Sequence, residues 1–330
     1  MSVDIRSIDP TSDRGLRAAY DVESASLAYD RFEWVPLGFD SRAVVWRRRK
    51  GWTHDLWGAY DGTDLVGIVD VATCLDDTLD TAWLFPHVLP GRRRQRIGTR
   101  LVRQAELSLE PSRTRLVGTA YYPEGQCDIA PPVRFAESLG YRLATTETVR
   151  ELDLTRYQRS AGEVRGYGIQ TFVNGVPHDL RVDVGRIKGL VDADAPSGEL
   201  DWGAITVTPE QYAAELEIWR RQERTVVESV ALTEDRHVVA WTCVVASSNA
   251  ARPASVEGTL VLTDHRGHGL GQAVKDASLI ELKRASPNLQ RVRTSSDDEN
   301  QWMHRINERM GFAAIEVEGL VQRSVSDSIR

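Results

Sequence analysis

Glycines and basic side chains gather in the segment 266–271, Arg-Gly-His-Gly-Leu-Gly, between an apolar run and a helical pattern. The apolar run at 259–262 is typical of a buried strand, and the apolar positions after Gly271 recur at helical spacing. Glycines let a ligand approach the backbone, while the N–H groups and the dipole at the start of a helix favour an anion. The segment therefore predicts a phosphate-binding loop between a strand and a helix.

Spacing excludes two common phosphate motifs. A Walker loop requires Lys directly after its second Gly, but Gln272 follows Gly271 here. The dinucleotide fingerprint requires Gly at its sixth position, and Gln272 also occupies that place when the motif starts at Gly267. The spacing that remains is Arg-x-x-Gly-x-Gly, formed by Arg266, Gly269 and Gly271, with an ordinary glycine-rich turn as the alternative.

A helix cap follows downstream of this loop. Residues 291–294 are typical of a short strand, and residues 300–310 of a helix that ends at Gly311, where a C-cap requires positive φ. Loop and cap together resemble the GNAT superfamily of acyl-CoA-dependent N-acyltransferases. The form Asn-x-x-Met-x-x-Ile-Asn-x-x-Met-Gly-Phe, which begins at Asn300, resembles the mycothiol-synthase-like two-domain members.

The same two landmarks occur upstream in a less regular form. A basic loop precedes a helical pattern at Gly98, and a second helical pattern ends at Gly140. The separation along the chain between Gly98 and Gly271 is nearly the same as that between Gly140 and Gly311. A nearly constant offset at two separate landmarks indicates an internal duplication. The chain is therefore similar to tandem GNAT proteins over nearly its whole length.

The resemblance implies an α/β (α+β) fold class, with two tandem GNAT folds that each have a central mixed, mostly antiparallel twisted sheet flanked by helices. We expect an N-terminal GNAT-like domain at 1–154, a polar linker at 155–165 and a C-terminal GNAT domain at 166–330. Prolines at 131 and 132 interrupt the region where the first domain should have a regular helix. Arg96 stands where the second loop has Gly269, so its Cβ is expected to hinder close backbone approach. We therefore expect the second domain to catalyse and the first to be structural or to shape the acceptor pocket.

The resemblance also implies acetyl-CoA, or another acyl-CoA, as co-substrate, and no metal. A splayed gap beside the strand before the loop would admit the pantetheine arm, and a free backbone N–H near Val261 and Leu262 would polarise the thioester carbonyl. Arg266 would be a charge partner of the phosphates. The expected cofactor-binding residues are Val261, Leu262, Arg266, Gly267, His268, Gly269, Leu270, Gly271 and Asn300.

Two positions are the first candidates for the catalytic step, with Asp297, Asp298 and Glu299 as second choices for the base and His304 as a weaker one. Glu257, on the strand before the loop, matches a region from which GNAT enzymes draw a carboxylate base, and an alkylammonium with a pKa of about 10 needs a base near pH 7. Many family members have a Tyr four residues before the cap glycine to protonate the leaving thiolate, but this chain has Asn307 there and Ala136 in the first copy. Asn307 is therefore expected to act as a hydrogen-bond donor to the leaving group.

An acidic segment precedes the catalytic strands of the second half. In GNAT enzymes the corresponding connection borders the acceptor site, so Asp192, Asp194, Asp201 and Trp202 are candidate acceptor-binding residues. The carboxylates would attract an ammonium group and the indole would offer a cation–π surface. The alternative is a solvated acidic loop with Trp202 packed inward.

The bulk properties fit a small-molecule enzyme. A net charge of −7 argues against a general nucleic-acid binder, and three well-separated cysteines suggest neither a zinc site nor disulfides. No apolar run approaches membrane-spanning length and no signal sequence is apparent, so a cytoplasmic protein is expected, either a monomer with an internal pseudo-dimer or a homodimer.

The predicted function is direct transfer of an acetyl group from acetyl-CoA to a primary amine of a small, cationic molecule by a ternary-complex mechanism. A natural product, an amino sugar or a thiol-metabolism compound would be the acceptor, and antibiotic biosynthesis or modification would be the setting. The alternative is a non-catalytic acyl-CoA-binding sensor, in keeping with the missing tyrosine. Binding of nucleic acid through arginine clusters is the least favoured function.

Overall fold

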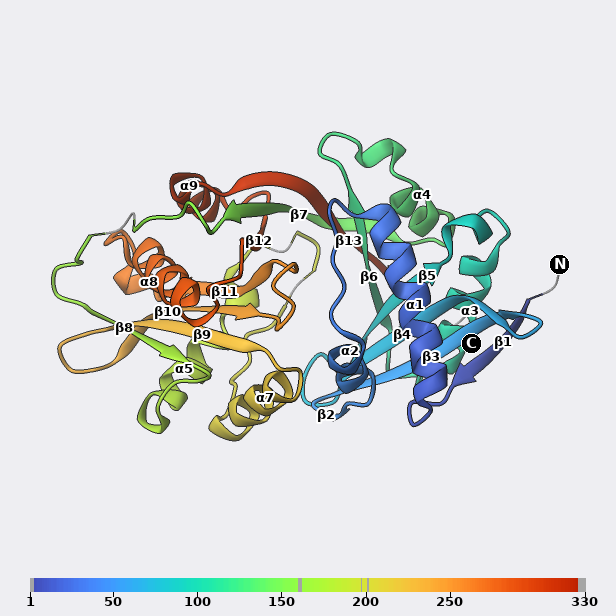
Figure 1. Ribbon diagram of the computed structural model, residues 1–330, viewed down its shortest axis with the longest axis horizontal. Coiled ribbons are helices and arrows are strands. Elements are labelled where there is room, and N and C mark those ends of the chain that lie inside the picture. The colour runs from blue at the N-terminus through green and yellow to red at the C-terminus, as the bar shows by residue number, and fades with distance from the viewer. Residues whose placement is uncertain (1–2, 160–161, 197, 201, 326–330) are drawn as a thin grey trace. The chain divides into compact units, whose positions relative to one another are not determined.

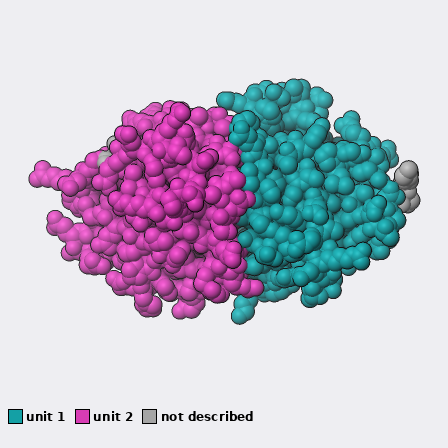
Figure 2. Space-filling view, in the orientation of Figure 1, with its two compact units in different colours: residues 1–146, 316–330 teal, residues 147–315 magenta. Residues whose placement is uncertain are grey.

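The computed structural model describes residues 3–159, 162–196, 198–200 and 202–325 (Figure 1). The chain divides into two compact units, which are coloured separately in Figure 2. Unit 1 comprises residues 1–146 and 316–330, and unit 2 comprises residues 147–315. Each unit has a mixed, mostly antiparallel sheet flanked by helices, as the resemblance implied.

Unit 1 has the strand order β1-β3-β4-β5-β6-β13, with β2 paired to β3. All these pairs are antiparallel except β5–β6, which is parallel. Helices cover both faces, because Ile68 of β4 packs with α1 and α2 while its neighbour Val69 packs in the core that contains α3. The elements that lie wholly in unit 1 are β1 (Asp4–Ile8), α1 (Asp13–Asp30), α2 (Phe39–Trp46), β2 (Arg49–Lys50), β3 (Trp52–Asp61), β4 (Asp64–Cys74), β5 (Thr81–Val88), η1 (Pro90–Arg92), α3 (Ile97–Ser108), β6 (Arg115–Tyr122), η2 (Cys127–Ile129) and α4 (Pro131–Ser138). The long strands β7 (Arg142–Asp153) and β13 (Ala313–Ser324) belong partly to unit 1 and partly to unit 2.

Unit 2 repeats this arrangement with the order β7-β12-β11-β10-β9-β8, in which only β11–β12 is parallel. Cys243 and Val245 of β10 pack in one core with α5 and α7, and Val244 between them packs with α8 on the other face. The elements are β8 (Gly168–Val173), η3 (His178–Leu180), α5 (Arg181–Lys188), α6 (Val191–Asp194), α7 (Pro209–Arg221), β9 (Thr225–Leu232), β10 (Val238–Ala246), β11 (Ala254–Val261), η4 (Thr263–His265), α8 (Leu270–Ala285), β12 (Arg291–Asp297) and α9 (Gln301–Met310).

The units do not follow the expected boundaries at 154 and 166, because the strands after the two caps are exchanged. Residues 147–153 of β7 pair with β12 of unit 2. Residues 317–324 of β13 pair with β6 of unit 1. Each unit thus takes its last sheet strand from the segment that follows the other unit's cap glycine.

Local sequence explains where α7 and α4 begin. Thr208 and Gln211 form a reciprocal capping box at the start of α7. The prolines expected to interrupt the helix of unit 1 instead occupy the first two positions of α4. Proline is tolerated there because the first N–H groups of a helix have no intrahelical partner. The expectation of a broken helix was wrong, and α4 is a short helix of 8 residues.

Candidate active site

The loop 266–271 has the geometry of an anion-binding turn. It joins η4 to α8, and Gly267 and Gly269 have φ angles of +82° and +78°. A Cβ built on either glycine would meet nothing within 4 Å, so the space above the loop is open. Gly269 is the N-cap of α8, whose first-turn N–H groups have no partner within the helix. Backbone donors and open space therefore coincide at this loop.

Arg266 fixes the loop to its surroundings. Its Nε donates to the carbonyl oxygen of Val261 at 3.1 Å, and its Nη2 donates to both carboxylate oxygens of Asp194 at 2.6 and 2.7 Å. His268 Nδ1 lies 3.2 Å from the carbonyl oxygen of His265. The guanidinium that was expected to meet phosphate is thus already paired, and a bound phosphate would have to share it with Asp194 or displace that carboxylate.

Two backbone N–H groups at the end of β11 beside the loop differ in whether they have a hydrogen-bond acceptor. The Leu262 N–H donates to the carbonyl oxygen of Val239 at 2.9 Å, so Leu262 does not supply the free N–H that was expected near Val261 and Leu262. Because hydrogen bonds alternate along an antiparallel pair, the N–H of Val261 points to the opposite edge, towards β12. β11 and β12 are paired only at Ala254–Val292 and Ser255–Arg293 and then separate. Val261 is therefore the better candidate for the oxyanion donor.

Glu257 occupies a β-bulge on β11. The register passes from Cys243–Gly258 to Val244–Val256, which leaves Glu257 as the extra residue. A bulge bends its strand and redirects the side chain, and here it comes just after the last pair with β12. The carboxylate is open to solvent on one side, but desolvation by the surrounding protein raises its pKa and outweighs the opposing effect of Arg224. A carboxyl with a raised pKa is suited to accept a proton near neutral pH.

Asn307 lies in a buried polar pair with Lys275 of α8. Lys275 Nζ donates to Asn307 Oδ1 at 2.7 Å, and the two residues are 1 % and 0 % exposed. Burial, reinforced by the positive charge of Arg150, lowers the pKa of Lys275 to about 7. Asn307 Nδ2 is buried and has no hydrogen-bond partner among the described residues. The expected hydrogen-bond donor is therefore available, although its oxygen is already used by the lysine.

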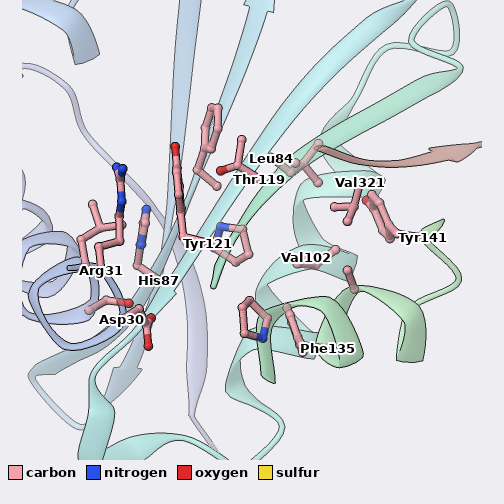
Figure 3. Close-up of a pocket in the computed structure, with 17 residues that line it drawn as sticks. Asp30, Arg31, Leu84, His87, Val102, Thr119, Tyr121, Phe135, Tyr141 and Val321 are labelled. Carbon is pink, nitrogen blue, oxygen red and sulfur yellow. The ribbon is translucent and has the colours of Figure 1, made fainter. Parts of the chain in front are cut away.

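Unit 1 contains a pocket of about 130 Å³ where β5 and β6 separate (Figure 3). The two strands pair only from Thr81–Arg115 to Trp83–Val117. His87, Asp30 and Arg31 lie along one side of the pocket, and apolar side chains lie along the other. The wall comprises Ser26, Leu27 and Asp30 of α1 and its C-cap Arg31, Leu84, Phe85, Pro86 and His87 of β5, Gly118, Thr119 and Tyr121 of β6, and Val102, Pro132, Phe135, Ala136, Tyr141 and Val321.

Titratable side chains crowd the α1 side of this pocket. His87 Nε2 lies 3.9 Å from Glu23 Oε1, and Arg42 donates to both oxygens of Glu23 at 2.9 and 2.5 Å. Tyr121 donates its hydroxyl hydrogen to Glu318 at 2.6 Å, and burial raises its pKa well above the usual value. The pocket therefore combines apolar walls with a neutral phenol and an imidazole, all from unit 1.

Comparison with known proteins relates one part of the chain to a family and the whole chain to a fold. Residues 198–312 match the Acetyltransferase (GNAT) family. The whole fold is similar to a tandem GNAT protein from the clavulanic acid biosynthesis pathway, with 21% identity, a TM-score of 0.82 and coverage of 99% of this chain and 100% of that chain. The whole chain has the fold of a tandem GNAT protein. The family match of residues 198–312 supports an N-acyltransferase, and the closer resemblance to mycothiol synthase stays a prediction.

Two further structures share the fold of this chain. A GCN5-related N-acetyltransferase from Sphaerobacter thermophilus has 18% identity and a TM-score of 0.67, with 99% of this chain and 97% of that chain covered. A glucosamine N-acetyltransferase region of a fungal multi-domain β-N-acetylglucosaminidase has 14% identity and a TM-score of 0.69, with coverage of 98% and 38%. No curated protein matches the sequence. At these identities the likeness concerns the fold and leaves substrates undetermined.

The structure describes Asp192, Asp194 and Trp202, three of the four residues that were expected to bind the acceptor. Asp194 of α6 is paired with Arg266, Asp192 is exposed, and Trp202 is half-buried. Asp201 lies outside the described residues. Asn300 is the N-cap of α9 and accepts from the Met303 N–H at 3.1 Å. The acidic segment therefore holds the phosphate loop through Asp194, which the sequence pattern did not predict.

The pocket of unit 1 contains functional candidates that no sequence pattern indicated. His87 and Glu23 are far apart along the chain, and neither belongs to a recognisable motif.

Among the described residues no group of three or more His, Cys, Asp or Glu could hold a metal ion. Within the same residues, no helix is both long and apolar enough to span a membrane.

Proposed function

We propose that the chain transfers an acetyl group from acetyl-CoA directly to a primary amine of a small molecule, with unit 2 as a catalytic unit. The loop 266–271 carries this proposal, because open space lies above two glycines with positive φ at the start of α8. Its backbone N–H groups would hold the coenzyme A diphosphate, and the pantetheine arm would enter where β11 and β12 separate.

The chemical step requires a base and a polarised carbonyl. Glu257 would accept the proton of the amine while the nitrogen attacks the thioester carbon. The N–H of Val261 would stabilise the developing oxyanion, and Asn307 Nδ2 would donate a hydrogen bond to the leaving sulfur. In this arrangement positioning supplies more of the rate than acid catalysis does.

The surroundings of Glu257 favour an acceptor that carries an anionic group beside its amine. Arg224 acts electrostatically on Glu257, and its own pKa is lowered by burial. Its buried Nε has no hydrogen-bond partner among the described residues. A half-buried guanidinium with an unused donor suits a carboxylate. The sequence predicted a cationic acceptor that the acidic segment would attract. The proposed acceptor differs because Asp194 of that segment is already paired with Arg266.

The test measures thiol release from acetyl-CoA with a panel of simple alkylamines and amino acids. Glu257→Gln should lower kcat with the best amine by about 10²–10⁴-fold. Arg224→Gln should raise KM for carboxylate-bearing amines about 10–100-fold and leave simple alkylamines unaffected, because a charge-assisted hydrogen bond is worth about 1.5–3 kcal/mol. Acetyl-CoA binding without turnover on any amine would instead favour the non-catalytic sensor.

A further inference from the structure

The pocket of unit 1 and the equivalent region of unit 2 differ at three positions. In unit 1 these positions hold apolar side chains, and Figure 3 shows two of them, Val102 and Val321, on the side of the pocket where Tyr141 lies. In unit 2 they hold a lysine, an amide and an arginine. The corresponding pairs are Val102 and Lys275, Ala136 and Asn307, and Val321 and Arg150.

Landmarks that the two units share establish these pairs. The first pair lies six residues after the N-cap of the loop helix, which is α3 in unit 1 and α8 in unit 2. The second pair lies four residues before the cap glycine of each unit. The third pair lies on the exchanged strands β13 and β7, and each member pairs with the fourth residue of its neighbour, β6 or β12. Equivalent places in the two units therefore differ in chemistry.

The residues of unit 2 at these positions offer positive charge and hydrogen-bond donors. Lys275 and Arg150 are both buried, and the charge of Arg150 acts on Lys275. Lys275 Nζ donates to Asn307 Oδ1 at 2.7 Å. The guanidinium of Arg150 donates to Ser296 Oγ at 3.5 Å. Among the described residues, no carboxylate forms an ion pair with either cation, and Asn307 Nδ2 has no acceptor. Buried cations without a counter-ion are costly, so this cluster is suited to an anion.

The reaction proposed for unit 2 produces an anion beside this cluster. When the carbon–sulfur bond of the thioester breaks, the sulfur of coenzyme A carries the negative charge, and Asn307 Nδ2 is the proposed donor to it. Lys275 Nζ already lies 3.9 Å from another sulfur, that of Met303. Met303 is half-buried and a methionine side chain is flexible, so it can move aside for a thiolate.

We propose that Lys275, Asn307 and Arg150 form a thiolate-binding site, which holds the sulfur of coenzyme A as an anion once the acyl group has been transferred. This site rests on the function proposed for unit 2 and adds two residues to it. Lys275 and Asn307 contact the sulfur, and Arg150 acts through its charge. A thiolate that is stabilised in this way needs no proton in order to leave, which accounts for the absence of the tyrosine found in many family members.

The ionisation of Lys275 fits this role. Burial and the charge of Arg150 lower the pKa of Lys275 to about 7. A thiolate at Nζ would stabilise the ammonium form and raise that pKa again. By the same interaction, the two cations lower the pKa of the thiol, by about 1–3 units at a separation of about 4–6 Å. Unit 1 has apolar side chains at the three positions, so its pocket should have no such effect.

The step balances without a further reactant. The amine nitrogen forms a bond to the thioester carbon, and its proton passes to Glu257. The carbon–sulfur bond breaks, and its electron pair stays on the sulfur, which Lys275 and Asn307 contact. The products are an amide, a thiolate and a protonated Glu257. When coenzyme A is released, the proton of Glu257 passes through water to the thiolate, so the net products are an amide and a thiol.

Titration of the thiol of coenzyme A bound to the full-length chain tests the site. The ultraviolet absorbance of the thiolate is followed as pH rises, and the same titration with desulfo-coenzyme A is subtracted to remove the signal of the three cysteines. We expect the pKa of the bound thiol to lie about 1–3 units below that of free coenzyme A. Lys275→Met and Arg150→Met should each lose most of this shift. Lys283→Met, on the same helix but near the surface, should keep it.

Steady-state kinetics give a second measurement. Lys275→Met should lower kcat with the best amine by about 10²–10³-fold and leave KM for acetyl-CoA unchanged, because it removes a donor to charge that develops in the transition state. Lys283→Met should keep the wild-type kcat. Isothermal titration with coenzyme A shows that each variant is folded and binds. A residue that only supports the fold would alter stability without altering the pKa of the bound thiol.

The outcomes separate this site from the function on which it rests. Suppose that coenzyme A binds to the wild type and not to Gly269→Glu. A bound thiol with the pKa of free coenzyme A, or a lowered pKa that persists in Lys275→Met, then overturns the thiolate-binding site and supports the loop of unit 2. If coenzyme A binds to neither protein, or equally well to both, the proposed role of the loop is overturned, and the thiolate-binding site with it.

Discussion

Replacing Lys275 by Met should stabilise the protein, and the gain should depend on pH. The ammonium group is 1 % exposed, and its pKa falls from 10.5 to about 7 because it is desolvated and close to Arg150. A shift of about 3.5 units corresponds to about 5 kcal/mol of cost to the charged form at about 1.4 kcal/mol per unit. Methionine has a similar length and carries no charge, so it removes this cost.

The sign follows from proton binding in the two states. Between pH 7 and 10.5 the unfolded chain keeps the Lys275 proton while the folded chain releases it, so wild-type stability rises with pH in that interval. The rise should be about 2 kcal/mol between pH 7 and pH 9. Lys275→Met leaves Asn307 Oδ1 without its donor, which costs about 1–3 kcal/mol. The net gain at pH 7 is therefore about 1–3 kcal/mol, and it should shrink towards pH 9.

Urea denaturation at pH 6, 7, 8 and 9 measures this difference. Lys283→Met is the matched control, because Lys283 is on the same helix and donates to the carbonyl oxygens of Thr155 and Tyr157 near the surface. The Lys275 variant should lose about 2 kcal/mol of its advantage between pH 7 and pH 9, while the control variant should show no such trend. If the stability difference between Lys275→Met and the wild type stays constant across this range, Lys275 does not lose its proton in the folded protein and the reasoning is refuted.

Three further predictions concern other charged groups. Glu257→Gln should abolish the fall in kcat/KM that the wild type shows as pH decreases through the raised pKa of Glu257; an acid limb that persists in the variant would assign the base to another group. Asp194→Asn should change stability by less than about 1 kcal/mol, since the pair with Arg266 is 39–46% exposed, and should tighten acetyl-CoA binding at low salt; weaker binding in calorimetry would show that the pair is needed to shape the loop. Burial alone would raise the pKa of Asp70, but His54, Arg42 and Trp46 lower it to about 2. The free energy of unfolding should therefore fall by about 2 kcal/mol as pH decreases from 4 to 2. In an acid titration followed by circular dichroism, Asp70→Asn should not show this loss.

Local signals in the sequence were sufficient for the loop, the cap and the fold class. Gly267, Gly269 and Gly311 all have positive φ, the backbone conformation for which glycine is favoured. The duplication was visible because two landmarks kept their separation. The prolines at 131 and 132 were misinterpreted, since their effect depends on whether they start a helix or interrupt one, and the sequence did not fix where the helix begins.

Sequence patterns did not predict which residues contact each other in the folded units. A lysine at 275 in a helix suggests a solvated position, and its burial depends on α9 packing against α8. His87 and Glu23 belong to a strand and a helix that meet only in the folded unit. The exchange of β7 and β13 was equally hidden, because the alternation of a strand does not reveal its partner.

That exchange sets an order of events during synthesis. Unit 2 is a continuous stretch, 147–315, and has all of its strands once residue 315 has left the ribosome. Unit 1 is begun first but completed last, because β13, the strand that pairs with β6, follows all of unit 2 along the chain. Until then β6 exposes an unpaired edge, which is a risk for mispairing. Expressing residues 1–154 alone would leave that edge permanently open, so a stop codon near the C-terminus should harm the N-terminal unit most.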